Sequence, residues 1–239
     1  AIFTVAKKEF GFNFDKANFI AGHSLGEYSA LCCYGALKFE DTLKILKKRG
    51  KSMQDAVSGD EGSMLAVVGS DLKVIENILK KNNRQCYIAN DNSPQQVVLS
   101  GLKKNINLFS EDLDKLKIKN IKLNVSAPFH CKLMENATIN MRAEILNLNL
   151  NEIKKPIVSN FTAKPTVSAS EIKNLLVSQI EGRVRWLESV EFMINKGTKN
   201  FIEIGPGKVL SGLIRRINKN VNFKSINSVQ DIKELNLDV

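Results

Sequence analysis

Apolar and polar positions along the chain follow the two spacings expected of strands and helices. Short apolar runs that predict strands lie at 18–22, 156–161 and 201–205. The intervening segments carry apolar residues at helical spacing, which predicts helices at 2–10, 27–37, 40–57, 131–146, 170–180, 186–196 and 208–219. Strands and helices in this order indicate an α/β protein.

The stretch from Gly62 to Ser126 has a pattern of its own. It predicts strands at 63–69, 85–90, 96–101 and 121–126, and helices at 71–82 and 105–117, with a turn at DNSPQ. The order β-α-β-β-α-β is that of the split ferredoxin-like unit, which can bury a small core of its own. We therefore expect a small subdomain at 58–128, inserted into a main domain formed by 1–57 and 129–239.

Composition narrows the class of protein. The 239 residues include no uncharged apolar run of about 18 residues, the length that spans a membrane, and the start AIFTVAKKEF lacks the features of a signal peptide. The four cysteines form neither a CxxC pair nor a Cys/His metal spacing. We expect a soluble protein of a reducing compartment, the cytoplasm or a plastid, without a metal site or a membrane partner.

The net charge of +10 and pI near 9.4 would suit an anionic partner. However, the lysines are scattered among asparagines and isoleucines, as in KKNNR and RRINKN, without interleaved aromatic residues. This pattern favours a solvated lysine-rich surface over a nucleic-acid site, and charge alone does not decide between the two.

Residues 22–26 form the sequence G-H-S-L-G between a predicted strand and a predicted helix. A sharp strand-to-helix turn of this kind exposes the hydroxyl of Ser24 on a strained backbone, and we expect both flanking glycines to be required because side chains there would collide. The N–H of Leu25, at the start of the helix, can donate to an oxyanion. The pattern predicts that Ser24 is a nucleophile.

A serine nucleophile needs a base, and the chain contains only two histidines. His23 precedes the serine directly, so its side chain should point away from Ser24. His130, in SAPFHCKLM, is therefore the predicted base, although a buried structural histidine is the ordinary alternative. Ordinary α/β-hydrolases place their histidine late in the chain, and no histidine follows Val184. This order disfavours a hydrolase.

Five segments in order resemble the malonyl-CoA:acyl carrier protein transacylases, relatives of the acyltransferase domains of fatty acid and polyketide synthases. They are GHSLGEYSAL, RGKSMQ, NSPQQVVLSG, SAPFHCKLM and IEIGPGKVLSGL. The resemblance implies an α/β-hydrolase-like main domain that carries the ferredoxin-like lobe. It also implies malonyl transfer from malonyl-CoA to an acyl carrier protein in fatty acid biosynthesis, by a monomer and without a cofactor.

The same resemblance implies roles for individual residues. Ser24 would carry the malonyl group and His130 would be its base, oriented by the main-chain carbonyl of Gln179. Arg49 would grip the malonate carboxylate, a role that suits the planar fork of a guanidinium; its position on an amphipathic helix would otherwise indicate a solvated charge.

The resemblance also places two residues around the substrate. Asn92 matches the hairpin near the mouth of the pocket, where a turn or strand role would explain it equally well. Phe129 would lie beside the α-carbon of the acyl group, where core packing is the alternative.

One segment of the family is not found in the sequence: the N-terminal strand followed by Gly-Gln-Gly-Ser-Gln, whose glutamine supplies a second oxyanion contact. The chain also begins without methionine. We therefore expect either that residues precede Ala1 or that the product is truncated and poorly active, since losing one oxyanion donor costs on the order of 10²- to 10³-fold in rate.

Three alternatives remain open on the sequence alone. One is a serine thioesterase or esterase built on the same elbow. The second is an inactive remnant that acts as a binding module, and the third is an acyltransferase unit of a larger synthase.

Overall fold

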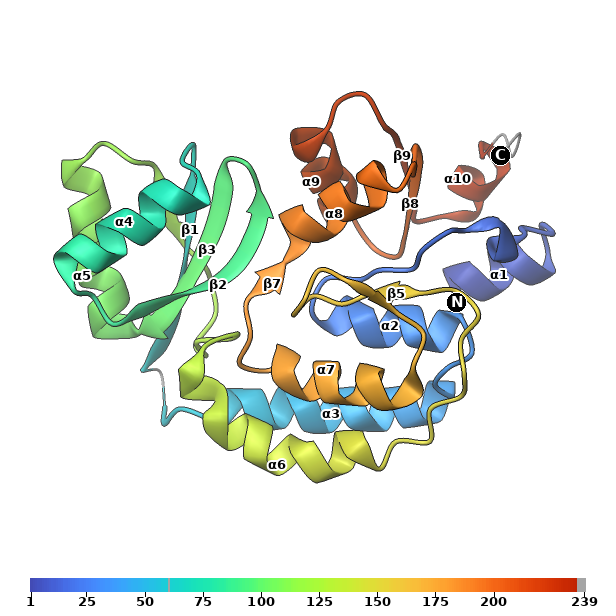
Figure 1. The fold of residues 1–239 in the computed structure, drawn as a ribbon, viewed down its shortest axis with the longest axis horizontal. Helices are drawn as coiled ribbons and strands as arrows, with labels where there is room; N and C mark the ends of the chain where they lie inside the picture. The colour runs from blue at the N-terminus through green and yellow to red at the C-terminus, as the bar shows by residue number, and fades with distance from the viewer. Residues whose placement is uncertain (60, 236–239) are drawn as a thin grey trace.

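The computed structural model describes residues 1–59 and 61–235. Two parts lie side by side: a lobe built on a five-stranded sheet, and a larger part dominated by helices (Figure 1). No helix in the described ranges is both long enough and apolar enough to cross a membrane.

The sheet of the lobe has the strand order β4-β1-β3-β2-β7. Its strands are β1 (Gly62–Val68), β2 (Cys86–Ser93), β3 (Gln96–Leu102), β4 (Asn120–Lys122) and β7 (Val184–Arg185). The first four pair antiparallel, with α4 (Leu72–Asn82) after β1 and α5 (Lys103–Lys115) after β3. The order β-α-β-β-α-β is therefore present as predicted.

Both faces of this sheet are buried, each against a different partner. One face packs on α4 and α5 through a core that includes Leu65, Val67, Ile75, Leu99, Ile106, Phe109 and Leu113. The other carries Met64, Ala66, Ala89 and Val98, with Phe129 packed against them. Alternating side chains of a strand point to opposite faces, so β1 and β3 supply both cores.

Strand lengths in the lobe differ from the prediction. β2 continues through most of the predicted turn to Ser93, and the hairpin closes over Pro94 and Gln95. β4 stops at Lys122, whereas the sequence predicted a strand to 126. The reason is that the chain turns back on itself there, with the N–H of Val125 donating to the carbonyl of Leu123 (2.9 Å).

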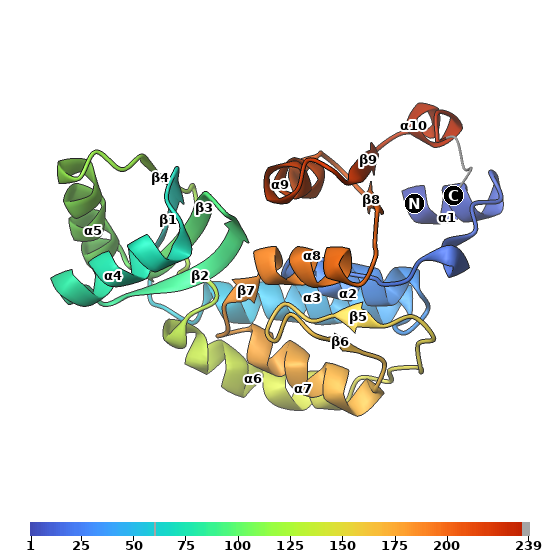
Figure 2. The same cartoon turned by 45° about the horizontal axis from the view of Figure 1, so that its top comes forward.

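The larger part is held together by helices that share one apolar core. The helices are α2 (Leu25–Cys33), α3 (Phe39–Gln54), α6 (Glu135–Leu146) and α7 (Ala169–Gln179). Tyr28, Leu31, Ile45, Met141 and Leu176 belong to this core. In Figure 1, α3, α6 and α7 lie below α2, and α6 packs against both α3 and α7; Figure 2 also shows α6 and α7 side by side below α2.

The strands of the larger part are short. β5 (Ile157–Val158) pairs with β6 (Pro165–Thr166), and β8 (Asn200–Ile204) pairs parallel with β9 (Asn222–Ile226). The strand predicted at 18–22 is wrong: it is reduced to one parallel bridge between Ile20 and Ile157. Ile20 exchanges hydrogen bonds only with Pro156 and Val158 (3.0 and 2.9 Å), and a strand needs repeated pairing.

The remaining helices lie toward the two ends of the chain. They are α1 (Ile2–Lys8), α8 (Trp186–Asn195), α9 (Val209–Ile217) and α10 (Val229–Lys233), with 3-10 turns at Phe14–Lys16 and Lys132–Met134. The N-terminal helix α1 and the C-terminal helix α10 are neighbours (Figure 1). Neither β9 nor α10 was predicted from the sequence.

Candidate active site

The turn at 22–26 places Ser24 directly before α2. Ser24 has φ 52° and ψ −106°, a region that residues with a side chain rarely occupy and that surrounding contacts must enforce. A Cβ on Gly22 would lie 2.0 Å from the carbonyl carbon of Gly26, so only glycine fits at position 22. At Gly26 a Cβ would have nothing within 4 Å, and the expectation that both glycines avoid a collision is wrong for this one.

Ser24, His130 and Gln179 form one line of hydrogen bonds. Ser24 Oγ lies 2.8 Å from His130 Nε2, and His130 Nδ1 lies 2.9 Å from the main-chain oxygen of Gln179. A carbonyl only accepts, so Nδ1 carries the proton and Nε2 is free to accept one from the serine hydroxyl. The contact with the Gln179 carbonyl is the one that the family resemblance implies.

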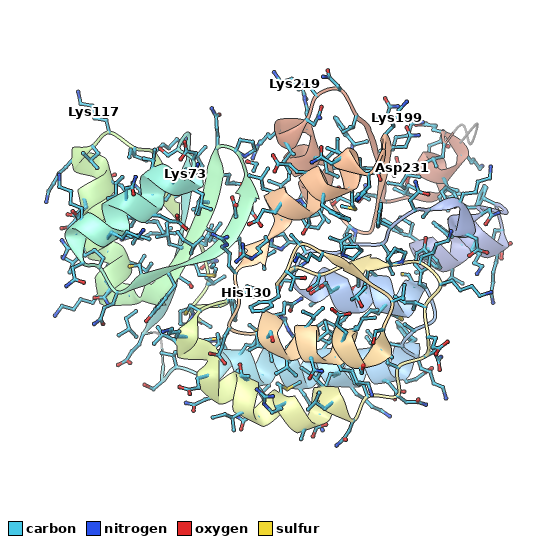
Figure 3. All side chains as sticks on the ribbon, viewed as in Figure 1. Lys73, Lys117, His130, Lys199, Lys219 and Asp231 are labelled. Carbon is cyan, nitrogen blue, oxygen red and sulfur yellow. The ribbon has the colours of Figure 1, made fainter. Side chains whose placement is uncertain are left out.

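His130 is buried at the junction of the lobe and the larger part (Figure 3). Burial, together with the positive charge of Arg49, lowers the pKa of His130 to about 3. The imidazole is therefore neutral near pH 7, the state in which Nε2 can take up a proton. A cleft of about 400 Å³ lies beside it, lined among others by Tyr87, Lys132 and Glu181.

Arg49 comes from α3 and is only 6 % exposed, so it is not a solvated charge. Its Nη2 donates to Ser24 Oγ (3.0 Å) and to Gln179 Oε1 (2.9 Å), and its guanidinium lies over the ring of Tyr28 (5.6 Å). Arg49 Nε is buried without a partner among the described residues. A buried cation with an unused donor beside the serine can bind an anionic group there.

Two further residues hold the elbow, and the sequence analysis did not identify either of them. Asn160 accepts from the N–H of Ser24 (2.6 Å) and donates its amide to the carbonyl of Gly22 (2.7 Å). Glu27 accepts from the N–H of Asn160 (3.0 Å) and from Gln179 Nε2. The signal for Glu27 was its place in the first turn of the helix, four residues before Leu31 and so on the same buried side.

The neighbouring predicted residues lie around this centre. His23 points away from Ser24 as expected, with Nε2 2.9 Å from Asn92 Oδ1 and its ring 5.7 Å from that of Trp186. Asn92 on β2 therefore joins the lobe to the elbow. Leu25 is the first residue of α2, where a backbone N–H has no carbonyl of its own helix to bind, and its side chain is 52 % exposed.

Phe129 lies next to His130 and is half-buried. It packs against the apolar core of the larger part and against the second face of the lobe sheet. This position gives it a packing role in addition to any contact with a substrate.

Comparisons with known proteins agree on the family. A family model described as "Acyl transferase domain" matches residues 10–236. The chain is 37% identical over 220 residues to the malonyl CoA-acyl carrier protein transacylase of Bacillus subtilis (strain 168), covering 90% of this chain and 69% of that protein. It is 40% identical over 223 residues to the protein of the same name from Staphylococcus aureus (strain MRSA252), covering 92% and 72%.

Solved structures of malonyltransferases are also similar to this chain. An acyl-carrier-protein-S-malonyltransferase from Bartonella henselae superposes with a TM-score of 0.93 at 39% identity, over 98% of this chain and 75% of the other. The malonyl-transacylase in a complex with a type II PKS acyl-carrier protein superposes with a TM-score of 0.91 at 34% identity, over 97% of this chain and 75% of the other. With a family model across nearly all of its residues and relatives at this identity, the chain belongs to the acyl transferase domain family.

Proposed function

We propose that this protein is an [acyl-carrier-protein] S-malonyltransferase, which moves a malonyl group from malonyl-CoA to the phosphopantetheine thiol of an acyl carrier protein for fatty acid biosynthesis. The observation that carries the proposal is one atom, Ser24 Oγ, which contacts both a neutral base and a buried cation: His130 Nε2 at 2.8 Å and Arg49 Nη2 at 3.0 Å. The relatives' names point to the same reaction.

In the first half-reaction Ser24 Oγ attacks the thioester carbonyl of malonyl-CoA while His130 Nε2 takes the hydroxyl proton. The N–H of Leu25 donates to the oxyanion that forms. As the tetrahedral intermediate collapses, the C–S bond breaks, His130 gives its proton to the leaving thiolate, and a malonyl ester remains on Ser24.

The second half-reaction runs the same steps in reverse with a different thiol. His130 takes the proton of the phosphopantetheine thiol, the sulfur attacks the ester carbonyl, and Ser24 leaves with the proton returned by His130. The carbonyl of Gln179 keeps the imidazole in the required tautomer throughout (2.9 Å to Nδ1), without a carboxylate in the catalytic line. CoA enters as part of the substrate, and the scheme needs no metal or cofactor.

Arg49 supplies the selectivity. In malonyl-CoA one methylene separates the carboxylate from the thioester carbonyl. Arg49 Nη2 lies 3.0 Å from Ser24 Oγ, the attacking oxygen. When the thioester carbonyl carbon is placed against Ser24 Oγ, the carboxylate is therefore within reach of the guanidinium. We assign Phe129 to the α-carbon side and Asn92 to the mouth of the site, where it joins the lobe to the elbow through His23.

The fold supports a division into parts that matches this scheme. We propose an α/β-hydrolase-like main domain at 1–57 and 129–239 and a ferredoxin-like subdomain at 58–128, because the latter has the strand order β4-β1-β3-β2 and its own core. Ser24, Arg49 and Gln179 come from the main domain, and His130 follows the lobe directly. We further propose that the protein acts as a monomer in the cytoplasm, or in a plastid.

Incubation with malonyl-CoA and a holo acyl carrier protein tests the proposal. Malonyl-carrier protein should accumulate at a rate that depends on the carrier concentration, with little free malonate. Release of malonate at the same rate with or without the carrier would instead indicate a thioesterase, and no reaction at all would favour a remnant.

A further inference from the structure

The carboxylate of Glu27 lies wholly inside the protein, 3 % exposed, at the meeting point of α2, the loop at 158–160 and the end of α7. Oε1 accepts from the N–H of Asn160 (3.0 Å) and Oε2 accepts from Gln179 Nε2. Both oxygens therefore act as acceptors from amide donors. A carboxyl group is costly to bury unless it is hydrogen-bonded, and these two contacts supply the hydrogen bonds.

The contact with Gln179 fixes the direction of that side chain. An amide carries its donors on nitrogen and its acceptor on oxygen, and the Nε2 of Gln179 donates both to Glu27 and to the carbonyl of Ser24 (3.0 Å). Oε1 must then face the other way, where it accepts from Arg49 Nη2 (2.9 Å). The Ser24 carbonyl and the donors of Arg49 favour the same orientation, and the carboxyl group of Glu27 adds an acceptor that a donor at position 27 would oppose.

Gln179 contributes to the site twice, since its main-chain oxygen also accepts from His130 Nδ1 (2.9 Å). One wholly buried residue thus orients the base through its backbone and the arginine through its side chain. We propose, building on the function proposed above, that Glu27 is a positioning residue: by holding the amide of Gln179 in one orientation it sets the guanidinium of Arg49 to receive the carboxylate of the acyl group.

Glu27 also supports the elbow by another route, through the N–H of Asn160, whose side chain holds Ser24 and Gly22. The two routes have different consequences. Loss of the elbow support would slow every acyl group alike. Loss of the Gln179 orientation would slow malonyl transfer selectively, because an acetyl group has no carboxylate for Arg49 to bind.

The variant Glu27→Gln separates these routes. The N–H of Asn160 is part of the main chain, so the new amide keeps its oxygen toward it and presents its NH₂ to Gln179. The Gln179 amide then has no orientation without conflict. Unturned, its NH₂ meets the new NH₂, donor against donor; turned over, its NH₂ faces Arg49 Nη2 and its oxygen faces the Ser24 carbonyl. We expect kcat/KM for malonyl-CoA to fall at least tenfold more than kcat/KM for acetyl-CoA.

The double variant Glu27→Gln with Gln179→Glu restores the contacts with position 27 and with Arg49, the charge being exchanged, although it loses the donor to the Ser24 carbonyl. A carboxylate at 179 can accept from the new amide and from Arg49 together, so the malonyl-to-acetyl ratio should return toward the wild-type value even if both rates are lower. It also keeps the proposal testable if Glu27→Gln alone does not fold. Glu203→Gln is the matched control, because Glu203 also accepts from backbone N–H groups, two of them at the start of α9 (3.0 and 2.7 Å). The malonyl-to-acetyl ratio of kcat/KM should not change in this variant.

Steady-state kinetics with both thioesters on these proteins gives the answer. A lowered ratio in Glu27→Gln that recovers in the double variant supports the proposal. An unchanged ratio in Glu27→Gln, or a double variant that folds without recovery, would overturn it and leave Glu27 a structural residue. A wild-type protein that does not transfer malonyl at all would contradict the proposed function itself, a result visible before any variant is compared.

Discussion

Replacing Arg49 tests the substrate preference most sharply. Arg49→Ala removes a cation that is 6 % exposed and contacts Ser24 Oγ at 3.0 Å and Gln179 Oε1 at 2.9 Å. In the complex with malonyl-CoA the substrate carboxylate would be buried opposite it. Truncating one partner of a buried charge pair costs about 2–5 kcal/mol, which is roughly 30- to several thousand-fold in kcat/KM.

The acetyl group has no carboxylate, so Arg49→Ala should leave kcat/KM for acetyl-CoA within about tenfold of the wild type. Arg49→Lys keeps the charge but cannot offer two parallel N–H donors. Its kcat/KM for malonyl-CoA should therefore lie between the values of the wild type and of Arg49→Ala. Transfer to a holo acyl carrier protein, followed for both thioesters over a range of concentrations, gives kcat/KM for each protein with each thioester.

Arg142→Ala, an exposed arginine on α6, serves as the control for loss of a positive charge, and thermal unfolding checks that each variant is folded. Equal losses with malonyl- and acetyl-CoA in Arg49→Ala would refute the reasoning, because they would show that the guanidinium supports Ser24 and Gln179 and does not bind the carboxylate. Equal use of the two thioesters by the wild type would refute it as well.

Three further predictions concern the base, the α-carbon and pH. His130→Ala should reduce transfer by several orders of magnitude, whereas His23→Ala, which loses the contacts with Asn92 and Trp186 but none with Ser24, should reduce it far less; a His130 variant within tenfold of the wild type would mean that another base operates. Phe129→Ser should raise the use of methylmalonyl-CoA relative to malonyl-CoA by roughly 10- to 200-fold, the worth of one methyl group in a closed pocket, and an unchanged ratio would leave Phe129 a packing residue. Burial lowers the pKa of His130 to about 3, so the contribution of His130 to stability is complete above its unfolded value near 6.5 and is lost as pH falls. Burial raises the pKa of Glu27 to about 7, against the opposing effects of Asn160, Gln179 and Arg49, so the cost of ionising it appears as pH rises above about 4.5. As pH is lowered from 6.5 to 4.5, the melting temperature of the wild type should therefore fall relative to that of His130→Gln and rise relative to that of Glu27→Gln. Melting temperatures that change in parallel with pH in all three proteins would contradict both assignments.

The sequence was informative where function depends on a local pattern. The elbow at 22–26 and the β-α-β-β-α-β order of the lobe were both readable because turn residues and apolar periods are local. Arg49 was not: its neighbours Lys47 and Lys48 indicate a solvated helix face, and only the family resemblance gave it a role. One of its buried partners, Gln179, is 130 positions away in the chain.

The elements and residues that the sequence analysis did not predict also depend on contacts between residues far apart in the chain. The segment 18–22 has the composition of a strand, but a strand exists only where neighbours pair with it, and Ile20 bonds to β5 alone. β9 carries little apolar pattern and forms because β8 lies beside it. Asn160 and Glu27 resemble an ordinary loop residue and an ordinary helix residue until folding brings them under Ser24.

The most direct test of the account is a mass measurement of the acyl-enzyme. Brief mixing with malonyl-CoA, acid quench and intact-protein mass spectrometry should show one added malonyl group, and peptide mapping should place it on Ser24. Ser24→Ala should fold normally and show no adduct, whereas Ser29→Ala, an exposed serine of the same helix, should be acylated like the wild type. A wild type that never gains the malonyl group, or an adduct that persists in Ser24→Ala, would contradict the account.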